Sequence, residues 1–243
     1  MELFTSIAFL FFGGIFPTFI WLYFWLREDA KNPEPKWVIT KTFVYGMLAV
    51  PVAGALQYLI KTTLFPDSEI QMMFFEKYFL TISILVVWAT IEEVFKYIAG
   101  LRGGLSNKSN NEPLDAFVYM ITAGLGFAAL ENSLFLFDLV RNGDSLVNIV
   151  VTGNMRFLGA SVLHIISSGI VGIFIALSYY KKNEIKKRYL LSGLILAITL
   201  HSIFNSFIIR SDGFTLVAFA MSWLVALFLI LYVEKIKNKK LQA

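Results

Sequence analysis

The chain has 243 residues, of which 57% are hydrophobic and only 16% are charged, whereas soluble domains carry about 25% charged residues. Several apolar runs reach about 20 residues, the length needed to cross a bilayer core, so the composition excludes an ordinary soluble domain and predicts an all-α polytopic membrane protein. The absence of cysteine excludes disulfides, thiolate catalysis and cysteine-ligated metals. The net charge of +4 lies in the predicted loops and the tail, where it indicates orientation in the membrane and not nucleic-acid binding.

The apolar runs predict a transmembrane helical bundle of about seven spans. The spans are expected at residues 3–26, 39–60, 78–101, 115–140, 157–180, 189–209 and 213–233. The first run lacks the basic start and small-residue cleavage pattern of a signal peptide, so it is interpreted as a span. We expect a single integral membrane domain over residues 1–243, with the candidate site in the core spans at 78–209 and a basic tail at 234–243.

Lysine and arginine predict the orientation of the bundle. With seven spans, alternate loops lie on opposite sides, and roughly three-quarters of the 21 basic residues fall on one side. Loops on the cytoplasmic side carry the excess of positive charge, so the N-terminus is expected outside and the C-terminus in the cytoplasm. The basic segment Lys181–Arg188 is expected to be a cytoplasmic loop, and the moderately apolar loop Arg141–Arg156 to lie at the membrane interface.

The third predicted span contains charged residues within an apolar run that begins near Tyr78. Glu92, Glu93 and Lys96 lie in this run, and a charged side chain at the centre of a membrane helix costs roughly 2.5–3.5 kcal/mol. On a helix, Lys96 can reach either carboxylate, being three and four residues away. An ion pair with Lys96 therefore accounts for one glutamate. We interpret the other glutamate as a residue that takes part in a chemical reaction. The alternatives are a structural ion pair and a transporter site.

Three further predicted spans each place an ionisable group deep in the membrane. At 1.5 Å per residue, Glu131 lies about 24 Å into its span, His164 about 24 Å from the cytoplasmic end of the next, and His201 about 18 Å into its own. Phe127 shares a helix face with Glu131, and Asn205 shares one with His201. Small residues, which permit close packing of membrane helices, flank these groups: Ala123, Gly124, Gly126, Ser167, Ser168, Gly169 and Gly172. The pattern predicts four helices packed around one polar cluster.

Each of these polar residues also has a structural interpretation. A single membrane histidine is usually a hydrogen-bonded packing residue, Glu131 with Asn132 can form a polar clamp between helices, and Arg156 can anchor a helix at the interface. Asp115 is interpreted as a favourable charge at a helix N-terminus. The combination of three carboxylates, two histidines and an asparagine inside the membrane is what favours a chemical site.

Five motifs follow one another in a distinctive order. They are Glu92-Glu93-x-x-Lys96, Glu112-Pro113-Leu114-Asp115, Gly126-Phe127-Ala128-Ala129-Leu130-Glu131-Asn132, Arg156 with His164, and His201-x-x-x-Asn205. Together they resemble the PrsW family of intramembrane proteases, which looks distantly related to the CAAX prenyl protease and bacteriocin-processing superfamily. The resemblance covers about residues 88–206, and it departs from the usual family pattern at Ala116, where the family has glycine.

The resemblance implies a glutamic-type intramembrane endopeptidase in the cell membrane of a prokaryote. The implied catalytic residues are Glu92, Glu93, Glu131, His164 and His201. The implied supporting residues are Lys96, Phe127, Asn132, Arg156 and Asn205. The implied substrate is a single-span or membrane-anchored protein, such as the anti-sigma factor that founding members cut at site 1 during an envelope stress response. No nucleic-acid partner is expected, and nothing in the sequence indicates the oligomeric state.

The predicted mechanism is hydrolysis by a water molecule that Glu92 activates as general base, with Glu93 or Lys96 fixing its charge. His201 and Asn205 would donate hydrogen bonds to the oxyanion, while His164 and Glu131 would orient the water or carry a proton. We expect no cofactor; the lesser alternative is zinc held by His164, His201 and Glu131. The alternative functions are a proton-coupled transporter or channel that uses the cluster as a relay, and a scaffold that binds lipid or a partner helix.

Overall fold

The computed structural model describes residues 11–28, 32–64, 74–210 and 213–240, and it contains helices and short connections without a strand in these residues. The predicted all-α fold class is therefore confirmed. The α-helices are α2 (Phe16–Glu28), α3 (Lys36–Leu64), α4 (Phe74–Gly100), α5 (Pro113–Arg141), α6 (Leu146–Met155), α7 (Ser161–Leu177), α8 (Asn183–Arg210) and α9 (Phe214–Lys240). Three π-helical segments extend them: η1 (Phe11–Ile15), η2 (Leu101–Leu105) and η3 (Arg156–Ala160).

Five helical segments within the described residues are long and apolar enough to cross a membrane. They are Lys36–Leu64, Pro113–Arg141, Leu146–Leu177, Asn183–Arg210 and Phe214–Glu234. The third of these joins α6, η3 and α7 into one span. This number of membrane-length helices identifies a multi-pass membrane protein. The full count of seven spans and the orientation of the two termini stay predictions.

Two segments that were expected to be loops are helical. The predicted interfacial loop Arg141–Arg156 contains α6, because Ser145 caps that helix by accepting the backbone N–H of Asn148 and the apolar side chain of Ile149 is buried. The predicted basic loop Lys181–Arg188 lies largely in α8, which begins at Asn183, because lysine and arginine are good helix formers on an exposed turn. The connection between the spans predicted at 39–60 and 78–101 lies partly outside the described residues, and its described parts, residues 61–64 and 74–77, belong to α3 and α4. The tail predicted at 234–243 also lies partly outside them, and its residues up to 240 belong to α9.

The N-terminus of α5 is closed by a capping box, which supports the structural interpretation of Asp115. The Oδ2 atom of Asp115 accepts the backbone N–H of Asn111 at 2.7 Å and of Glu112 at 2.8 Å, and Pro113 occupies the first turn. Asp115 is fully buried. Its carboxylate therefore fixes the start of the helix that carries Glu131.

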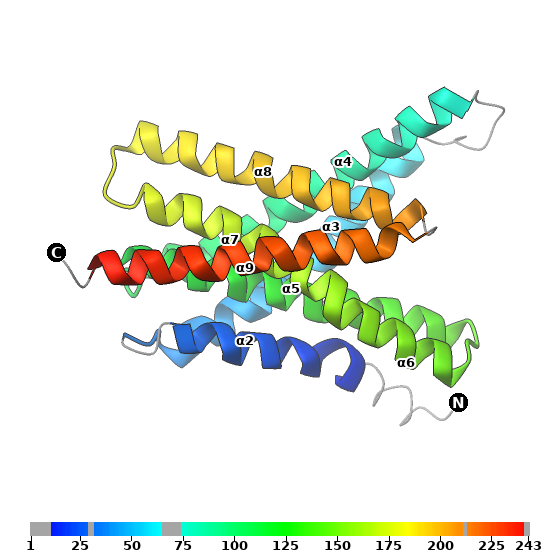
Figure 1. Cartoon of the computed structure of the whole chain (residues 1–243), viewed down its shortest axis with the longest axis horizontal. Helices are drawn as coiled ribbons and strands as arrows, with labels where there is room; N and C mark the ends of the chain where they lie inside the picture. The colour runs from blue at the N-terminus through cyan, green and yellow to red at the C-terminus, as the bar shows by residue number, and fades with distance from the viewer. Residues whose placement is uncertain (1–10, 29–31, 65–73, 211–212, 241–243) are drawn as a thin grey trace.

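Helix α5 lies at the centre of the bundle, with α2 and α3 against it on one side and the packed set α7, α8 and α9 on another (Figure 1). Small residues allow this close packing. A Cβ atom on Gly46 of α3 would collide with the backbone oxygen of Ala123, and one on Gly126 of α5 would collide with that of Phe43. A Cβ atom on Gly124 would collide with the side chain of Ser168 of α7 and come within 2.9 Å of the backbone oxygen of His164. Because no side chain separates the backbones, polar groups on the three helices can reach one another.

Substitution of Gly46 by alanine tests this close packing. We expect Gly46→Ala to lower stability by about 1–3 kcal/mol, because the new methyl group must displace backbone and not a flexible side chain. Gly54→Ala is the matched control on the same helix, since a Cβ there meets no atom within 4 Å. The midpoint of thermal unfolding in detergent should fall for the first variant and stay or rise for the second. Equal midpoints would show that α3 and α5 do not pack at Gly46.

Candidate active site

Three charged residues of α4 are buried in the bundle. Lys96 is 0% exposed, Glu93 is 1% exposed and Glu92 is 7% exposed. The Nζ atom of Lys96 lies 2.5 Å from Oε1 of Glu93, within one turn of the helix. The lysine therefore pairs with Glu93, which leaves Glu92 as the second carboxylate.

Glu92 is held through only one of its two oxygens. Its Oε1 atom accepts a hydrogen bond of 3.1 Å from the side-chain amide of Gln57 on α3. Its Oε2 atom is buried, has no hydrogen-bond partner among the described residues, and lies 3.6 Å from Nε2 of His201. One oxygen is thus positioned while the other faces the interior of the cluster.

His201 of α8 lies between the two glutamates. Its Nδ1 atom is 2.7 Å from Oε1 of Glu93, and its Nε2 atom points to Glu92. Because an ionised carboxylate only accepts hydrogen bonds, Nδ1 of His201 carries the proton in this contact. Glu93 thereby receives hydrogen bonds from both Lys96 and His201, and it fixes the orientation of each.

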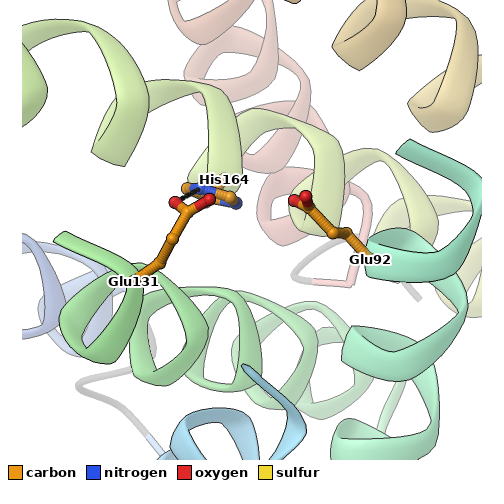
Figure 2. A group of neighbouring side chains, drawn as sticks. All are labelled: Glu92, Glu131 and His164. Atoms are coloured by element: carbon orange, nitrogen blue, oxygen red, sulfur yellow. Dashed lines mark hydrogen bonds and ion pairs between the residues drawn. The ribbon is translucent and has the colours of Figure 1, made fainter. Parts of the chain in front are cut away.

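His164 of α7 connects α4 to Glu131 of α5. Its Nδ1 atom lies 3.1 Å from Nζ of Lys96, and its Nε2 atom lies 2.9 Å from Oε2 of Glu131. A lysine ammonium only donates hydrogen bonds, so Nδ1 accepts and Nε2 carries the proton that faces Glu131. Figure 2 shows Glu131 and His164 in contact, with Glu92 directed from α4 toward the same space.

Arg156, at the start of η3, holds Glu131 in place. Its Nη2 atom donates to Oε2 of Glu131 at 2.9 Å, and its Nε donates to Oδ1 of Asn132 at 2.7 Å. The amide of Asn132 in turn donates to Ser161 at 3.0 Å. The guanidinium plane also lies over the ring of Phe135, 4.4 Å from its centroid. Arg156 therefore positions the carboxylate as well as neutralising it.

A cavity of about 250 Å³ opens beside these groups. Its polar lining comes from Glu131, Arg156, His164, His201 and Asn205, and its apolar lining includes aromatic rings of α5, α8 and α9. Asn205 lies one turn after His201 on α8 and faces the same cavity. The cavity therefore borders the side of the polar cluster that carries Glu131, His164 and His201, and Glu92 does not line it.

The structure brings the ten predicted site residues to one region. Glu92, Glu93, Lys96, Glu131, His164 and His201 form a connected set of polar contacts. The ring of Phe127 packs on Lys96 at 5.4 Å and on His164 at 5.5 Å. Asn132 and Arg156 support Glu131, and Asn205 lines the cavity. These are positions, and the role of each residue stays a prediction.

Three residues outside the predicted site contact the cluster, and one of them, Ser167, was expected only as a small packing residue. Gln57 contacts Glu92, Ser161 contacts Asn132, and Ser167 lies 3.4 Å from Lys96. A signal existed for Gln57, because it is the only amide or charged side chain between Pro51 and Ile60, and a polar group inside a membrane span needs a partner. Serines are common at membrane-helix contacts and carry no such signal.

Glu92, Glu131 and His164 can share a metal ion. One ligand atom from each residue lies within 4.8 Å of the others (Figure 2), and carboxylate oxygen and imidazole nitrogen are zinc ligands. The predicted zinc ligands were His164, His201 and Glu131. In the structure the third donor beside His164 and Glu131 is Glu92 and not His201. The donors fit a divalent ion in kind and spacing, provided that Nε2 of His164 loses its proton.

The fold and the site define a multi-pass membrane protein with carboxylate and imidazole groups clustered beside a cavity. These are the side chains that a membrane-embedded hydrolase would use. Residues 34–233 match the family described as PrsW family intramembrane metalloprotease, and the chain belongs to this family. The resemblance seen in the sequence motifs is thereby confirmed, and the chain is an intramembrane protease. The transporter alternative is not favoured.

Relatives named Protease PrsW occur in several bacteria. The chain is 27% identical to the one from Oceanobacillus iheyensis over 220 residues, which cover 89% of this chain and 92% of the relative. It is 28% identical to the one from Clostridioides difficile over 200 residues, covering 81% and 77%. The Bacillus subtilis relative is 23% identical over 194 residues, covering 79% of each chain. No solved structure matches the chain.

Proposed function

We propose that this protease hydrolyses a peptide bond of a membrane-anchored protein with a water molecule activated by Glu92. One observation carries this assignment: Oε1 of Glu93 accepts hydrogen bonds from both Lys96 and His201, whereas Glu92 accepts one only from the neutral amide of Gln57; Oε2 of each glutamate has no hydrogen-bond partner within the described residues. A general base needs an oxygen that is free to accept a proton. Gln57 supports the role by fixing the other oxygen of Glu92.

The charges of the cluster support a role for His201 beside this base. Three carboxylates, those of Glu92, Glu93 and Glu131, face two permanent cations, Lys96 and Arg156. One more positive charge neutralises the set, and a net charge in a low-dielectric interior is unfavourable. His201 lies between Glu92 and Glu93 with both ring nitrogens toward carboxylates, so it is the group at which such a charge would be balanced.

The tetrahedral intermediate needs hydrogen-bond donors at its oxyanion. We assign this role to Nε2 of His201 and the amide of Asn205, which both line the cavity. Glu92 would return the proton that it takes from water to the leaving amine, and the pair of His164 and Glu131, which share a contact of 2.9 Å beside the same cavity, would orient the water. Arg156 would keep Glu131 ionised and oriented.

A metal-dependent variant of this function is favoured by the spacing of the donor atoms of Glu92, Glu131 and His164 and by the description of the family. These residues would hold a divalent ion, which would polarise the scissile carbonyl and lower the pKa of a bound water. The balance between the three carboxylates and the cations around them supports the metal-free form. A chelator should stop cleavage only in the metal-dependent form.

We expect cleavage by the purified protein to persist in EDTA and in 1,10-phenanthroline, and elemental analysis to find no stoichiometric zinc. The physical reason is that Lys96 and Arg156 already contact His164 and Glu131, two of the three donors. Chelator-sensitive cleavage that zinc restores, with metal present in the wild type and absent from Glu131→Gln, would assign the donors to an ion.

The proposed activity is tested with purified protein in detergent and a single-span substrate with a fluorescent tag on each side of the membrane segment. We propose an anti-sigma factor type of substrate, cut at the cell membrane in which the seven-span chain lies with its tail in the cytoplasm. Peptide fragments identified by mass spectrometry would support the proposal. Solute flux in liposomes without any cleavage product would replace it with the transporter.

A further inference from the structure

A second cavity lies apart from the active site, at the junction where α4 and η2 end, α7 ends and α8 begins. Its volume is about 390 Å³, and it shares no lining residue with the active-site cavity. In Figure 1 this junction lies by the loop that joins α7 to α8, away from the α6 end of the bundle. The proposed function makes no use of it.

The lining of this second cavity is divided between an apolar wall and a basic mouth. The wall is formed by Leu101, Leu105, Ile175 and Leu190. The mouth is formed by residues of the first turns of α8, which include Lys186 and Lys187, with Tyr179 opposite them. The ammonium group of Lys186 lies 5.7 Å from the centroid of the Tyr179 ring. Glu184, the acidic residue of this first turn, does not line the cavity.

The lining also contains a buried hydrogen-bond acceptor. The side-chain Nδ2 of Asn110 donates to the backbone oxygen of Leu105 at 2.8 Å, which fixes the orientation of the amide. Its Oδ1 atom is buried and has no hydrogen-bond partner among the described residues. The hydroxyl of Tyr179 donates to the backbone oxygen of Asn110 at 2.8 Å and holds the residue in the wall.

We propose that this cavity binds an anionic phospholipid whose headgroup carries hydroxyl groups, of the phosphatidylglycerol class. Two lysines at the mouth suit a phosphate. The buried Oδ1 of Asn110 suits a donor, which a glycerol hydroxyl provides. The leucine and isoleucine wall suits an acyl chain. A soluble phosphate would leave this apolar wall uncovered, and an acidic peptide would not fill a gap between membrane helices in this way.

The bound lipid would support the helix that carries the catalytic glutamates. Tyr97 and Leu101 line the cavity, and Tyr97 directly follows Lys96 on α4. Tyr97, Leu105, Ile175 and Leu190 also pack around a small core of Met120, Val171 and Ala197. An occupant would therefore hold the end of α4 against α7 and α8, and it would stabilise the folded protein.

The test uses the full chain in nanodiscs of phosphatidylcholine to which phosphatidylglycerol is added in steps. Native mass spectrometry counts the retained lipid and thermal unfolding reports the stabilisation. We expect one retained phosphatidylglycerol, and a Lys186→Gln/Lys187→Gln variant that binds it at least about tenfold more weakly. The matched control is Lys181→Gln/Lys182→Gln, which removes the same charge from residues that do not line the cavity, and which should bind the lipid as the wild type does.

Three outcomes would overturn the proposal. Equal weakening in both double variants would mean that only the general surface charge attracts anionic lipid. Equal retention of phosphatidylcholine would mean that the cavity does not discriminate between lipid headgroups. Saturation by glycerophosphoglycerol, the same headgroup without acyl chains, would mean a soluble phosphate site. The lipid readouts require no cleavage assay, so their failure is distinguishable from failure of the proposed protease mechanism.

Discussion

Glu92→Gln is expected to lower cleavage by about 10²–10⁴-fold while leaving the fold intact, because glutamine keeps the shape of the side chain and loses the ability to accept a proton from water. The residue is not part of the Lys96 and Glu93 ion pair, and His201 keeps its contact with Glu93 when Glu92 is neutral. The measurement is the rate of cleavage of a single-span reporter by purified protein, with thermal unfolding measured on the same preparation.

Two variants serve as controls for this result. Glu184→Gln removes an exposed carboxylate from the first turn of α8 and should cleave as the wild type does. Gln57→Ala removes the hydrogen bond that positions Glu92 and should give a smaller loss than Glu92→Gln. A folded Glu92→Gln protein that cleaves at the rate of the wild type would remove Glu92 as the base.

Removal of Lys96 is expected to have the largest effect on stability. Lys96→Met leaves the carboxylate of Glu93 buried without its cation and also removes the donor to His164. Breaking one partner of a buried ion pair costs about 3–5 kcal/mol. The midpoint of thermal unfolding and the resistance to proteolysis in detergent should both fall. Lys61→Met, at an exposed position near the end of α3, should change neither.

The double variant Lys96→Met/Glu93→Gln separates the ion pair from the packing of its side chains. Neutralising both members removes the buried charge, so part of the lost stability should return. If Lys96→Met destabilised the protein no more than Lys61→Met does, the pair would contribute nothing to the fold. In that case Lys96 would not be what stabilises the buried negative charge of Glu93.

Much of the helical framework was predictable because membrane spans are long and apolar. The ends of α3, α4 and α5 lie within about four residues of the predicted spans, whereas α8 begins earlier and α9 ends later than the spans predicted at 189–209 and 213–233. The α6 segment was not, because its polar neighbours Asn142, Gly143 and Asp144 indicate a break, and the apolar turn after them does not reveal that it continues into α7. The basic start of α8 was read as a loop, since charge alone does not separate a loop from an exposed helical turn.

The members of the candidate site were predictable and their pairing was not. An ionisable residue inside a membrane span is costly enough to stand out in the sequence, and each of Glu92, Glu93, Glu131, His164 and His201 did so. Spacing on a helix allowed Lys96 to reach either glutamate. Only the position of α8 decides between them, because His201 completes the contacts of Glu93. Spacing along the helices also could not show which side chains share a metal site. His201 was predicted as a zinc ligand, but in the structure Glu92 lies nearer to Glu131 and His164 as the third donor.

Single-turnover cleavage in water labelled with oxygen-18 shows whether Glu92 activates water for direct attack on a peptide bond. Mass spectrometry of the fragments and of the enzyme follows the label. The account predicts one labelled oxygen in the new carboxyl terminus after the first turnover and none in Glu92. A first-turnover product without label, together with label in the Glu92 carboxylate after the turnover, would show a covalent acyl-enzyme and contradict the account.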